Sequence, residues 1–154
     1  MPIVIELPDG PPLEIDHLAL DFTGTLSTDG RLLPGVAERL VALSENVTIT
    51  VMTADTCGTA VEELEALPVE VHVIRKGLDK ASIVSGLPAK GVAAIGNGRN
   101  DLEMLKVATL GIAVIGAEGA AAELLRSAEV VAQDIVSALD LFLRPLRLVA
   151  TLRE

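Results

Sequence analysis

The apolar residues of the chain fall into short continuous runs separated by longer amphipathic stretches. Continuous runs rich in Val, Ile, Leu and Ala are typical of strands buried on both faces, and they predict strands at residues 13–21, 47–52, 69–74, 91–96, 110–116 and 129–132. Helical spacing of apolar residues predicts helices at residues 35–45, 58–67, 79–87, 101–108, 117–128 and 133–149. Alternating strands and helices indicate an α/β domain with a parallel sheet covered on both faces.

Two hairpins complete this pattern. Residues 2–7 and 13–21 flank a turn dense in Pro and Gly, which predicts an N-terminal hairpin that leads into a central strand ending at Asp21. Asp29-Gly30 between two short arms predicts a second, tight hairpin. The chain contains no internal repeat, linker or low-complexity tract, so residues 1–154 are expected to form one domain, a three-layer sandwich.

Polar residues follow three of the predicted strands. In parallel α/β sheets, ligands bind beyond the carboxyl ends of the strands. These ends read DFTGT from Asp21, TAD from Thr53 and GNGRND up to Asp101. Asp21 and Asp101 would converge from separate strands, and two such carboxylates repel each other unless a cation lies between them. Hard oxygen ligands with room for water suit magnesium.

The other groups at this edge suit a phosphoryl group. The Gly-rich turn before Asp101 exposes backbone amides that attract anions, and Thr25 and Thr53 add hydroxyl donors. A lysine from the helix that begins at Asp79 would add a positive charge. In such a site the free carboxylate of Asp21 can attack phosphorus.

Charge and composition narrow the choice of partner and compartment. The net charge of -10 argues against nucleic acid or an anionic membrane surface as a partner, because both would repel the protein. The single cysteine, Cys57, excludes an internal disulfide framework and fits a reducing compartment. No segment approaches the ~18 consecutive apolar residues of a membrane span, and the first residues lack the features of a signal peptide. We therefore expect a cytoplasmic protein.

Four short motifs resemble, in chain order, those of the haloacid dehalogenase superfamily. They are DFTGTLS at residues 21–27, TAD at 53–55, the lysine of LDKASIV at 78–84 and GNGRNDLEML at 96–105. The first motif is most similar to that of the phosphorylation domain of P-type ATPases, which also has Thr two residues after the nucleophile, followed by Gly-Thr-Leu. The resemblance covers about residues 15–142 and implies a Rossmann-like, soluble, P-type ATPase-like phosphatase.

The resemblance implies a role for each motif. Asp21 would be the nucleophile that forms an aspartyl-phosphate, Thr53 would hold the phosphoryl group, and Lys80 would neutralise its charge. Magnesium would be held by the carboxylates of Asp21 and Asp101 and by the backbone carbonyl of Thr23. The residues implied to bind the substrate are Phe22, Thr23, Gly24, Thr25, Ala54 and Asn100.

Several of these residues have alternatives. Lys76 and Lys90 compete with Lys80, which is preferred because it opens the apolar helix ASIVSGL at the family's distance before the fourth motif. Polar residues after strands also cap helices or turns without any chemical role. The residues open to such a role are Asp21, Thr53, Asp55, Asn100 and Asp101.

The motifs depart from the family pattern at four positions. Phe22 stands where the ATPases have Lys, and Ala54 replaces the usual Gly of the second motif. Asn97 stands where many members have an acid, so either Asn97 or water would complete the metal shell. Phosphatases of the superfamily usually have a second Asp, as general acid and base, where this chain and the ATPases have Thr23. Because acid–base help contributes about 10²–10⁴ in rate, we expect slow turnover and a preference for good leaving groups.

The spacing of the motifs leaves no room for a cap domain. Only 31 residues separate Asp21 from Thr53, and 26 separate Thr53 from Lys80. The predicted hairpin, helices and strands account for the residues of both intervals. The nucleotide-binding domain of the ATPases would lie in the first gap, so no adenine pocket is expected, and the lack of transmembrane helices excludes ion pumping. The open site would admit a small or macromolecular phosphorylated substrate, or be covered by a second subunit of a homo-oligomer.

The sequence thus predicts a magnesium-dependent phosphohydrolase. The main alternative is a regulatory protein that is phosphorylated on Asp21, or binds phosphate, without useful turnover. Bacterial receiver domains share the size, the acidity and an Asp-Thr-Lys-magnesium site, but they carry a pair of acids on the first strand that this sequence lacks. A structural subunit that keeps the motifs by descent is the third alternative.

Overall fold

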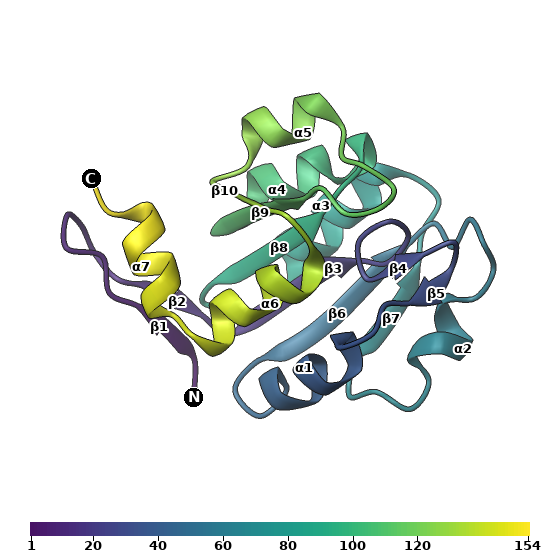
Figure 1. The fold of residues 1–154 in the computed structure, drawn as a ribbon, viewed down its shortest axis with the longest axis horizontal. Helices are drawn as coiled ribbons and strands as arrows, with labels where there is room; N and C mark the ends of the chain where they lie inside the picture. The colour runs from purple at the N-terminus through teal and green to yellow at the C-terminus, as the bar shows by residue number, and fades with distance from the viewer.

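A six-stranded parallel sheet forms the centre of the protein (Figure 1). The computed structural model describes all of residues 1–154. Across the sheet the strands follow the order β10 (Val130–Ala132), β9 (Leu110–Val114), β8 (Val92–Gly96), β3 (His17–Asp21), β6 (Thr48–Thr53) and β7 (Glu70–Val73). All neighbouring strands pair in parallel, which confirms the predicted sheet.

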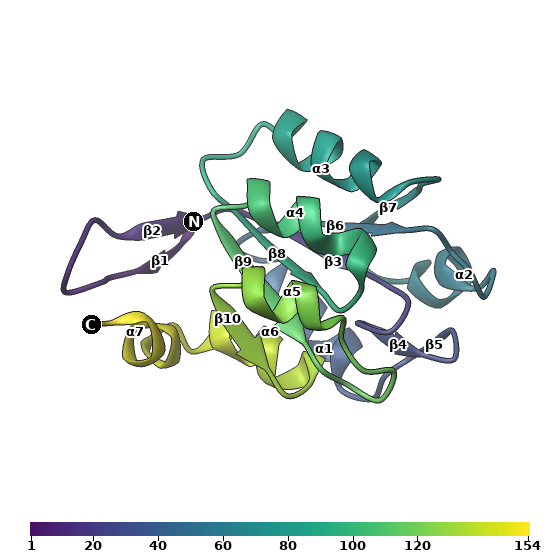
Figure 2. The same cartoon turned by 90° about the horizontal axis from the view of Figure 1, so that it is seen from above.

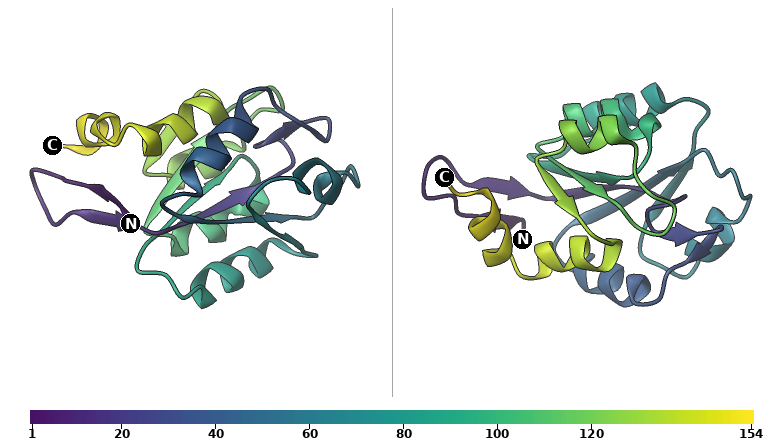
Figure 3. Two further views of the ribbon diagram at one scale, coloured as in Figure 1. Left: turned by 90° about the horizontal axis from the view of Figure 1, so that it is seen from below. Right: turned by 45° about the horizontal axis from the view of Figure 1, so that its top comes forward.

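Helices cover both faces of this sheet (Figures 2 and 3). One face carries α1 (Val36–Leu43), α2 (Ala60–Leu64) and α6 (Ile135–Leu143), and the other carries α3 (Gly77–Gly86), α4 (Leu102–Val107) and α5 (Ala122–Ser127). Helix α7 (Leu146–Leu152) lies beyond the sheet, beside the N-terminal hairpin. The three-layer architecture is therefore confirmed. None of the helices combines the length and apolar character needed to cross a lipid bilayer.

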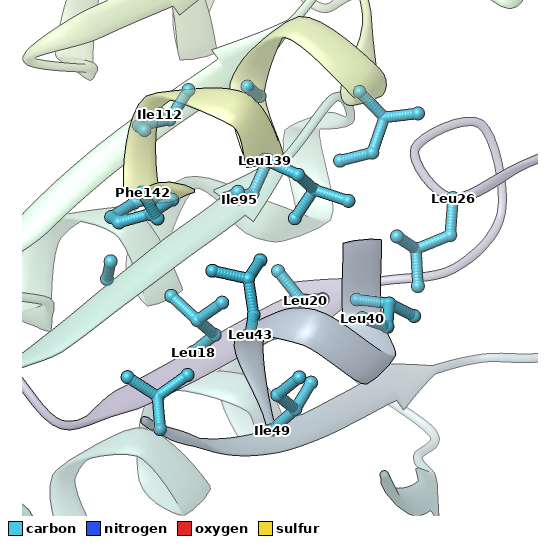
Figure 4. Packing of buried hydrophobic residues seen from close by; sticks show 14 of the residues in the cluster. Leu18, Leu20, Leu26, Leu40, Leu43, Ile49, Ile95, Ile112, Leu139 and Phe142 are labelled. Carbon is cyan, nitrogen blue, oxygen red and sulfur yellow. The ribbon is translucent and has the colours of Figure 1, made fainter. Parts of the chain in front are cut away.

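The two faces of the sheet bury separate cores. In the larger core, Leu18 and Leu20 of β3 pack with Leu40 of α1 and Phe142 of α6 (Figure 4). In the smaller core, Ala19 of β3 faces α3 and α4. Successive side chains of a strand point to opposite faces. The whole of β3 is therefore buried, which explains why it reads as a continuous apolar run up to its last residue.

The order of the strands creates a switch point next to β3. From β3 the chain builds β6 and then β7 on one side, and α3 carries it across to β8 on the other side of β3. Chain segments that follow β3 and β8 therefore leave the sheet in opposite directions, and ligands bind in the crevice at such points. Because β3 pairs with both β6 and β8, Asp21 is held at the middle of this edge.

The predicted N-terminal hairpin consists of β1 (Ile3–Ile5) and β2 (Leu13–Ile15), paired antiparallel. Asp16 separates β2 from β3. Its carboxylate accepts hydrogen bonds from the backbone amides of Lys90 and Gly91, each at 3.1 Å. These bonds fasten the start of β3 to the segment that leads into β8.

The second predicted hairpin pairs β4 (Ser27–Thr28) with β5 (Arg31–Leu32), and residues 27–32 are called the flap hairpin. Asp29 and Gly30 at its tip have positive φ angles of 53° and 79°. Two successive residues of this kind form the turn that Asp-Gly favours, so the prediction is confirmed.

The helix predicted at residues 117–128 begins only at Ala122. Gly116 and Gly119 adopt positive φ angles of 49° and 75°, a conformation outside the right-handed helix that glycine adopts without strain. Residues 115–121 therefore form a loop beyond the carboxyl end of β9.

The single helix predicted at residues 133–149 is wrong, because the segment forms the two helices α6 and α7. Pro145 stands between them. Proline lacks a backbone amide donor and restricts the residue before it, so the hydrogen-bond pattern of α6 ends there.

Candidate active site

Three charged side chains meet at the carboxyl edge of the sheet. Asp21 ends β3, Lys80 lies in the first part of α3, and Asp101 ends a short 3₁₀ helix (Arg99–Asp101) that follows β8. The Lys80 ammonium donates hydrogen bonds to Asp21 Oδ1 at 2.7 Å and to Asp101 Oδ1 at 2.6 Å. All three residues are buried, so the lysine bridges the two acids away from solvent.

Two glycines allow this close assembly. A Cβ atom on Gly96 would lie 2.5 Å from the side-chain carboxyl carbon of Asp101. A Cβ atom on Gly77, at the start of α3, would lie 2.6 Å from the backbone oxygen of Asn100. A side chain at either position would therefore push Asp101 or α3 away from the site.

The cluster holds two acids and one cation. Burial, followed by repulsion from Asp101, raises the pKa of Asp21 to about 7, although Lys80 and the Thr25 hydroxyl act in the opposite direction. Burial alone would lower the pKa of Lys80, but attraction to the two carboxylates outweighs it and the pKa is raised. The lysine therefore stays protonated, and with both acids ionised the cluster is short of one positive charge.

Neighbouring groups orient both acids. Asp101 Oδ2 accepts hydrogen bonds from the backbone amides of Asn97 at 3.1 Å and Gly98 at 3.0 Å. The Thr25 hydroxyl lies 3.0 Å from Asp21 Oδ2 and 3.2 Å from the side-chain oxygen of Asn97. A hydroxyl has one proton and can serve only one of these acceptors at a time. One acceptor oxygen is thus left for another ligand.

These residues fit a magnesium ion. The oxygens available are the Asp21 carboxylate, the Asn97 side-chain oxygen and the Thr23 carbonyl, and magnesium is bound through one or two carboxylates with water completing its shell. Asp101 uses three of its roughly four acceptor sites on Lys80 and two amides, which leaves one. The chain brings together no group of three or more His, Cys, Asp or Glu side chains suited to a metal, so water would supply the remaining ligands.

A pocket of about 210 Å³ lies beside Asp21. Its lining residues are Asp21, Thr23, Thr53, Ala54, Thr56, Asn97, Gly98, Asn100 and Glu118. In its wall, the hydroxyl oxygen of Thr23 is buried and has no hydrogen-bond partner. Leaving a buried hydroxyl unpaired costs about 1–3 kcal/mol, so a polar ligand in the pocket would relieve this cost.

The pocket is lined by three of the six residues implied to bind the substrate, and by Thr53, which was implied to hold the phosphoryl group. Those that line it with Asp21 are Thr23, Thr53, Ala54 and Asn100. Those that do not line it are Phe22, Gly24 and Thr25. The side chain of Phe22 is fully buried in the larger core, so the position of the ATPase lysine serves packing here. The Thr25 hydroxyl faces Asp21 from behind the pocket wall.

The structure also shows where the competing lysines lie and which of the predicted residues cap a helix. Lys76 and Lys90 are exposed, and neither contacts an acid of the site. The Thr53 hydroxyl accepts a hydrogen bond from the backbone amide of Asp55 at 2.8 Å and does not reach α2. Asp55 itself caps the start of α2, because its Oδ1 accepts hydrogen bonds from the amides of Thr59 and Ala60, each at 3.0 Å.

Two residues of the pocket wall, Thr56 and Glu118, were not predicted. Glu118 lies in the loop of residues 115–121, where the sequence pattern predicted the end of a strand (110–116) and the start of a helix (117–128). The signal for a loop was present in the two glycines that flank it, since each favours a turn over a helix. Both residues follow the carboxyl end of a strand, as the other residues of the wall do.

A larger cavity of about 510 Å³ lies at the opposite edge of the sheet, around His17 and Asp16. Its histidine is hydrogen-bonded to Thr50 at 2.7 Å, and its aspartate is bound by backbone amides. No lysine or arginine side chain lines this cavity. The smaller pocket beside Asp21 is therefore the candidate active site.

Comparison with known proteins finds similarities in sequence and in fold. An uncharacterized protein of Methanocaldococcus jannaschii is 52% identical over 67 residues, which are 44% of this chain and 72% of that protein. A 3-deoxy-D-manno-octulosonate 8-phosphate phosphatase from Moraxella catarrhalis, solved with magnesium, phosphate and KDO, is similar with a TM-score of 0.72 and 16% identity over 88% of this chain and 90% of that chain. A zinc-transporting PIB-type ATPase in the E2P state is similar with a TM-score of 0.64 and 23% identity over 77% of this chain and 20% of the ATPase.

At such identities the two solved structures show a shared fold and no more. The sequence itself carries the family assignment. The model of the haloacid dehalogenase-like hydrolases matches residues 53–134, which is more than half of the chain and spans Lys80 and Asp101. The chain therefore belongs to the haloacid dehalogenase-like hydrolases.

Proposed function

We propose that the protein is a magnesium-dependent phosphohydrolase that forms an aspartyl-phosphate on Asp21. The observation that supports this most is the contact of Lys80 with both Asp21 and Asp101 in a buried cluster beside a polar pocket. Membership of a hydrolase family and the fold shared with a phosphatase are consistent with a phosphorylated substrate.

In the first step Asp21 acts as the nucleophile. A carboxylate oxygen forms a bond to the phosphorus of the substrate, while the bond from phosphorus to the leaving oxygen breaks and the leaving group keeps the electron pair. Water then attacks the same phosphorus, the bond to Asp21 breaks, and inorganic phosphate leaves. Thr53 and Asn100 in the pocket wall would bind the phosphoryl oxygens, and Lys80 would hold Asp21 in place.

Magnesium, when bound by Asp21, Thr23 and Asp101, would screen the negative charge that a phosphoryl group brings to these acids. The size of the substrate is not restricted by a cap, and Ala54, Asn100 and Glu118 are exposed at the rim. A phosphorylated macromolecule can therefore approach as well as a small molecule, and a second copy of the chain could cover the rim.

Aryl phosphates are expected to be hydrolysed much faster than alkyl phosphates. Thr23 cannot give a proton to a leaving oxygen near neutral pH, and the missing acid is worth about 10²–10⁴ in rate for a poor leaving group. Phosphate release from p-nitrophenyl phosphate and from glycerol phosphate measures the ratio. Equal rates would contradict this role of Thr23, and one stoichiometric phosphorylation without turnover would favour the regulatory alternative.

Magnesium is expected to stabilise the wild-type protein against heat. At ten times its dissociation constant a ligand adds about 1.4 kcal/mol of stability, which is about 3–6 °C in Tm for a chain of this size. The shift should disappear in Asp101→Asn and persist in Asp16→Asn, whose carboxylate lies at the opposite edge of the sheet. Thermal unfolding with magnesium and with EDTA measures it, and an equal shift in Asp101→Asn would exclude Asp101 as a ligand.

A further inference from the structure

The loop of residues 115–121 brings a carboxylate to the pocket from a side that the four motifs do not use. Glu118 lines the same pocket as Asp21 and Thr23. Its Oε2 accepts a hydrogen bond from the backbone amide of Asp29, at the tip of the flap hairpin, at 3.0 Å. Its other oxygen, Oε1, makes no hydrogen bond within the protein and is available to a molecule in the pocket.

This loop is tied to the residues that orient the nucleophile. The backbone amide of Ala121 donates a hydrogen bond to the carbonyl of Asn97 at 2.8 Å, and the side-chain amide of Asn97 donates one to the carbonyl of Gly119 at 3.1 Å. The side-chain oxygen of Asn97 in turn lies 3.2 Å from the Thr25 hydroxyl that contacts Asp21. Glu118 is thus held at the wall of the site by the hydrogen bond to its side chain and by those of the following residues Gly119 and Ala121 with Asn97.

We propose that Glu118 is the general base that activates water for hydrolysis of the aspartyl-phosphate, an inference that rests on the proposed function. Water attacks phosphorus and its proton passes to Glu118 Oε1. The bond between phosphorus and the Asp21 oxygen breaks, and the electron pair returns to the Asp21 carboxylate. Glu118 then releases the proton to solvent, and phosphate leaves the pocket.

The chemistry of the pocket wall favours Glu118 for this step. The other lining side chains that bear oxygen are hydroxyls and amides, which do not take a proton readily near neutral pH, and Asp21, whose carboxyl group is bonded to phosphorus at this step. An ionised carboxylate accepts protons but cannot donate them. Glu118 would therefore assist the second step and leave the first step without an acid, so the expected preference for aryl phosphates is unchanged.

The experiment compares Glu118→Gln with wild type by acid quench after mixing with excess acetyl phosphate and magnesium. A glutamine oxygen can still accept the hydrogen bond from Asp29, so this variant removes the base and keeps the tether to the flap hairpin. We expect the phosphoenzyme on Asp21 to form in both proteins and to decay about 10²–10⁴ times more slowly in Glu118→Gln. A phosphoenzyme visible only in the variant has the same meaning, because rapid decay in the wild type prevents its accumulation.

Glu63→Gln is the matched control. The Glu63 carboxylate accepts a hydrogen bond from the backbone amide of Leu32 in the same hairpin, also at 3.0 Å, but it does not line the pocket. The phosphoenzyme of Glu63→Gln should decay at a rate within about twofold of the wild-type rate. Equal decay in wild type and Glu118→Gln would overturn the role of Glu118 alone. If neither protein accumulates a phosphoenzyme but both release phosphate from acetyl phosphate at the same rate, the role of Glu118 alone is overturned. If neither protein forms a phosphoenzyme on Asp21 or releases phosphate, the proposed function is overturned, and the inference with it.

Discussion

The Asp21→Asn variant is expected to release no measurable phosphate from any substrate and to form no phosphoenzyme. An amide cannot attack phosphorus, and loss of a nucleophile lowers turnover by on the order of 10⁴-fold or more. The pocket should survive the change, because asparagine keeps an oxygen that can accept the hydrogen bond of the Thr25 hydroxyl. Phosphate release from p-nitrophenyl phosphate and mass spectrometry of the acid-quenched protein measure the two effects.

The fold of Asp21→Asn should be as stable as that of the wild type. Burial and repulsion from Asp101 raise the pKa of Asp21, so the buried negative charge opposes folding and a neutral side chain is tolerated. The matched control is Asp134→Asn. Asp134 caps α6 through the backbone amide of Ser137, and asparagine serves equally well at that position. Turnover by Asp21→Asn at the rate of this control would place the nucleophile elsewhere.

The parallel sheet could be predicted because its central strands β3, β8 and β9 are buried on both faces, whereas the edge strand β7 is largely exposed. Strands buried on both faces carry an uninterrupted apolar run, as β3 does, and the run ends where a charged group is needed at the edge of the sheet. Once the strands and their direction are known, the residues at their carboxyl ends must share one edge. This explains why Asp21, Thr53 and Asp101 could be grouped from the sequence alone.

Features that depend on single backbone angles or on contacts across the chain could not be predicted in the same way. The apolar spacing of residues 117–128 is helical and outweighed the two glycines in the prediction, and it is the φ angles of Gly116 and Gly119 that place Glu118 in a loop. The hydrogen bond from Asp29 to Glu118 joins segments 89 residues apart, and no local pattern reports it.

The choice of lysine shows the limit of spacing as an argument. Lys76 and Lys80 are one helical turn apart, so both could face the same way if the helix included both. The structure begins α3 at Gly77, which leaves Lys76 exposed before the helix while Lys80 reaches both acids. The catalytic role of Lys80 stays a prediction.

The Lys80→Met variant is expected to unfold far more readily than the wild type at neutral pH. Removing the cation leaves Asp21 and Asp101 buried and facing each other, and breaking a buried ion pair in this way costs about 3–5 kcal/mol. The loss of folding stability in Lys80→Met should increase as the pH rises. The folded pKa of Asp21 is already raised, and without the lysine it must rise further, so the folded state binds more protons than the unfolded state above about pH 4.

Stability of Lys80→Met should therefore fall as the pH rises from about 4 through neutrality, and acidification should restore part of it. Urea unfolding in EDTA at several pH values measures this dependence without interference from a metal. Lys76→Met, an exposed position just before the same helix, should change stability by no more than about 0.5 kcal/mol.

The double variant Lys80→Met/Asp101→Asn should regain part of the stability lost in Lys80→Met, because one of the two opposed charges is gone. If Lys80→Met were as stable as wild type at every pH, the two acids could not depend on the lysine, and the charge balance on which a bound cation was inferred would be wrong.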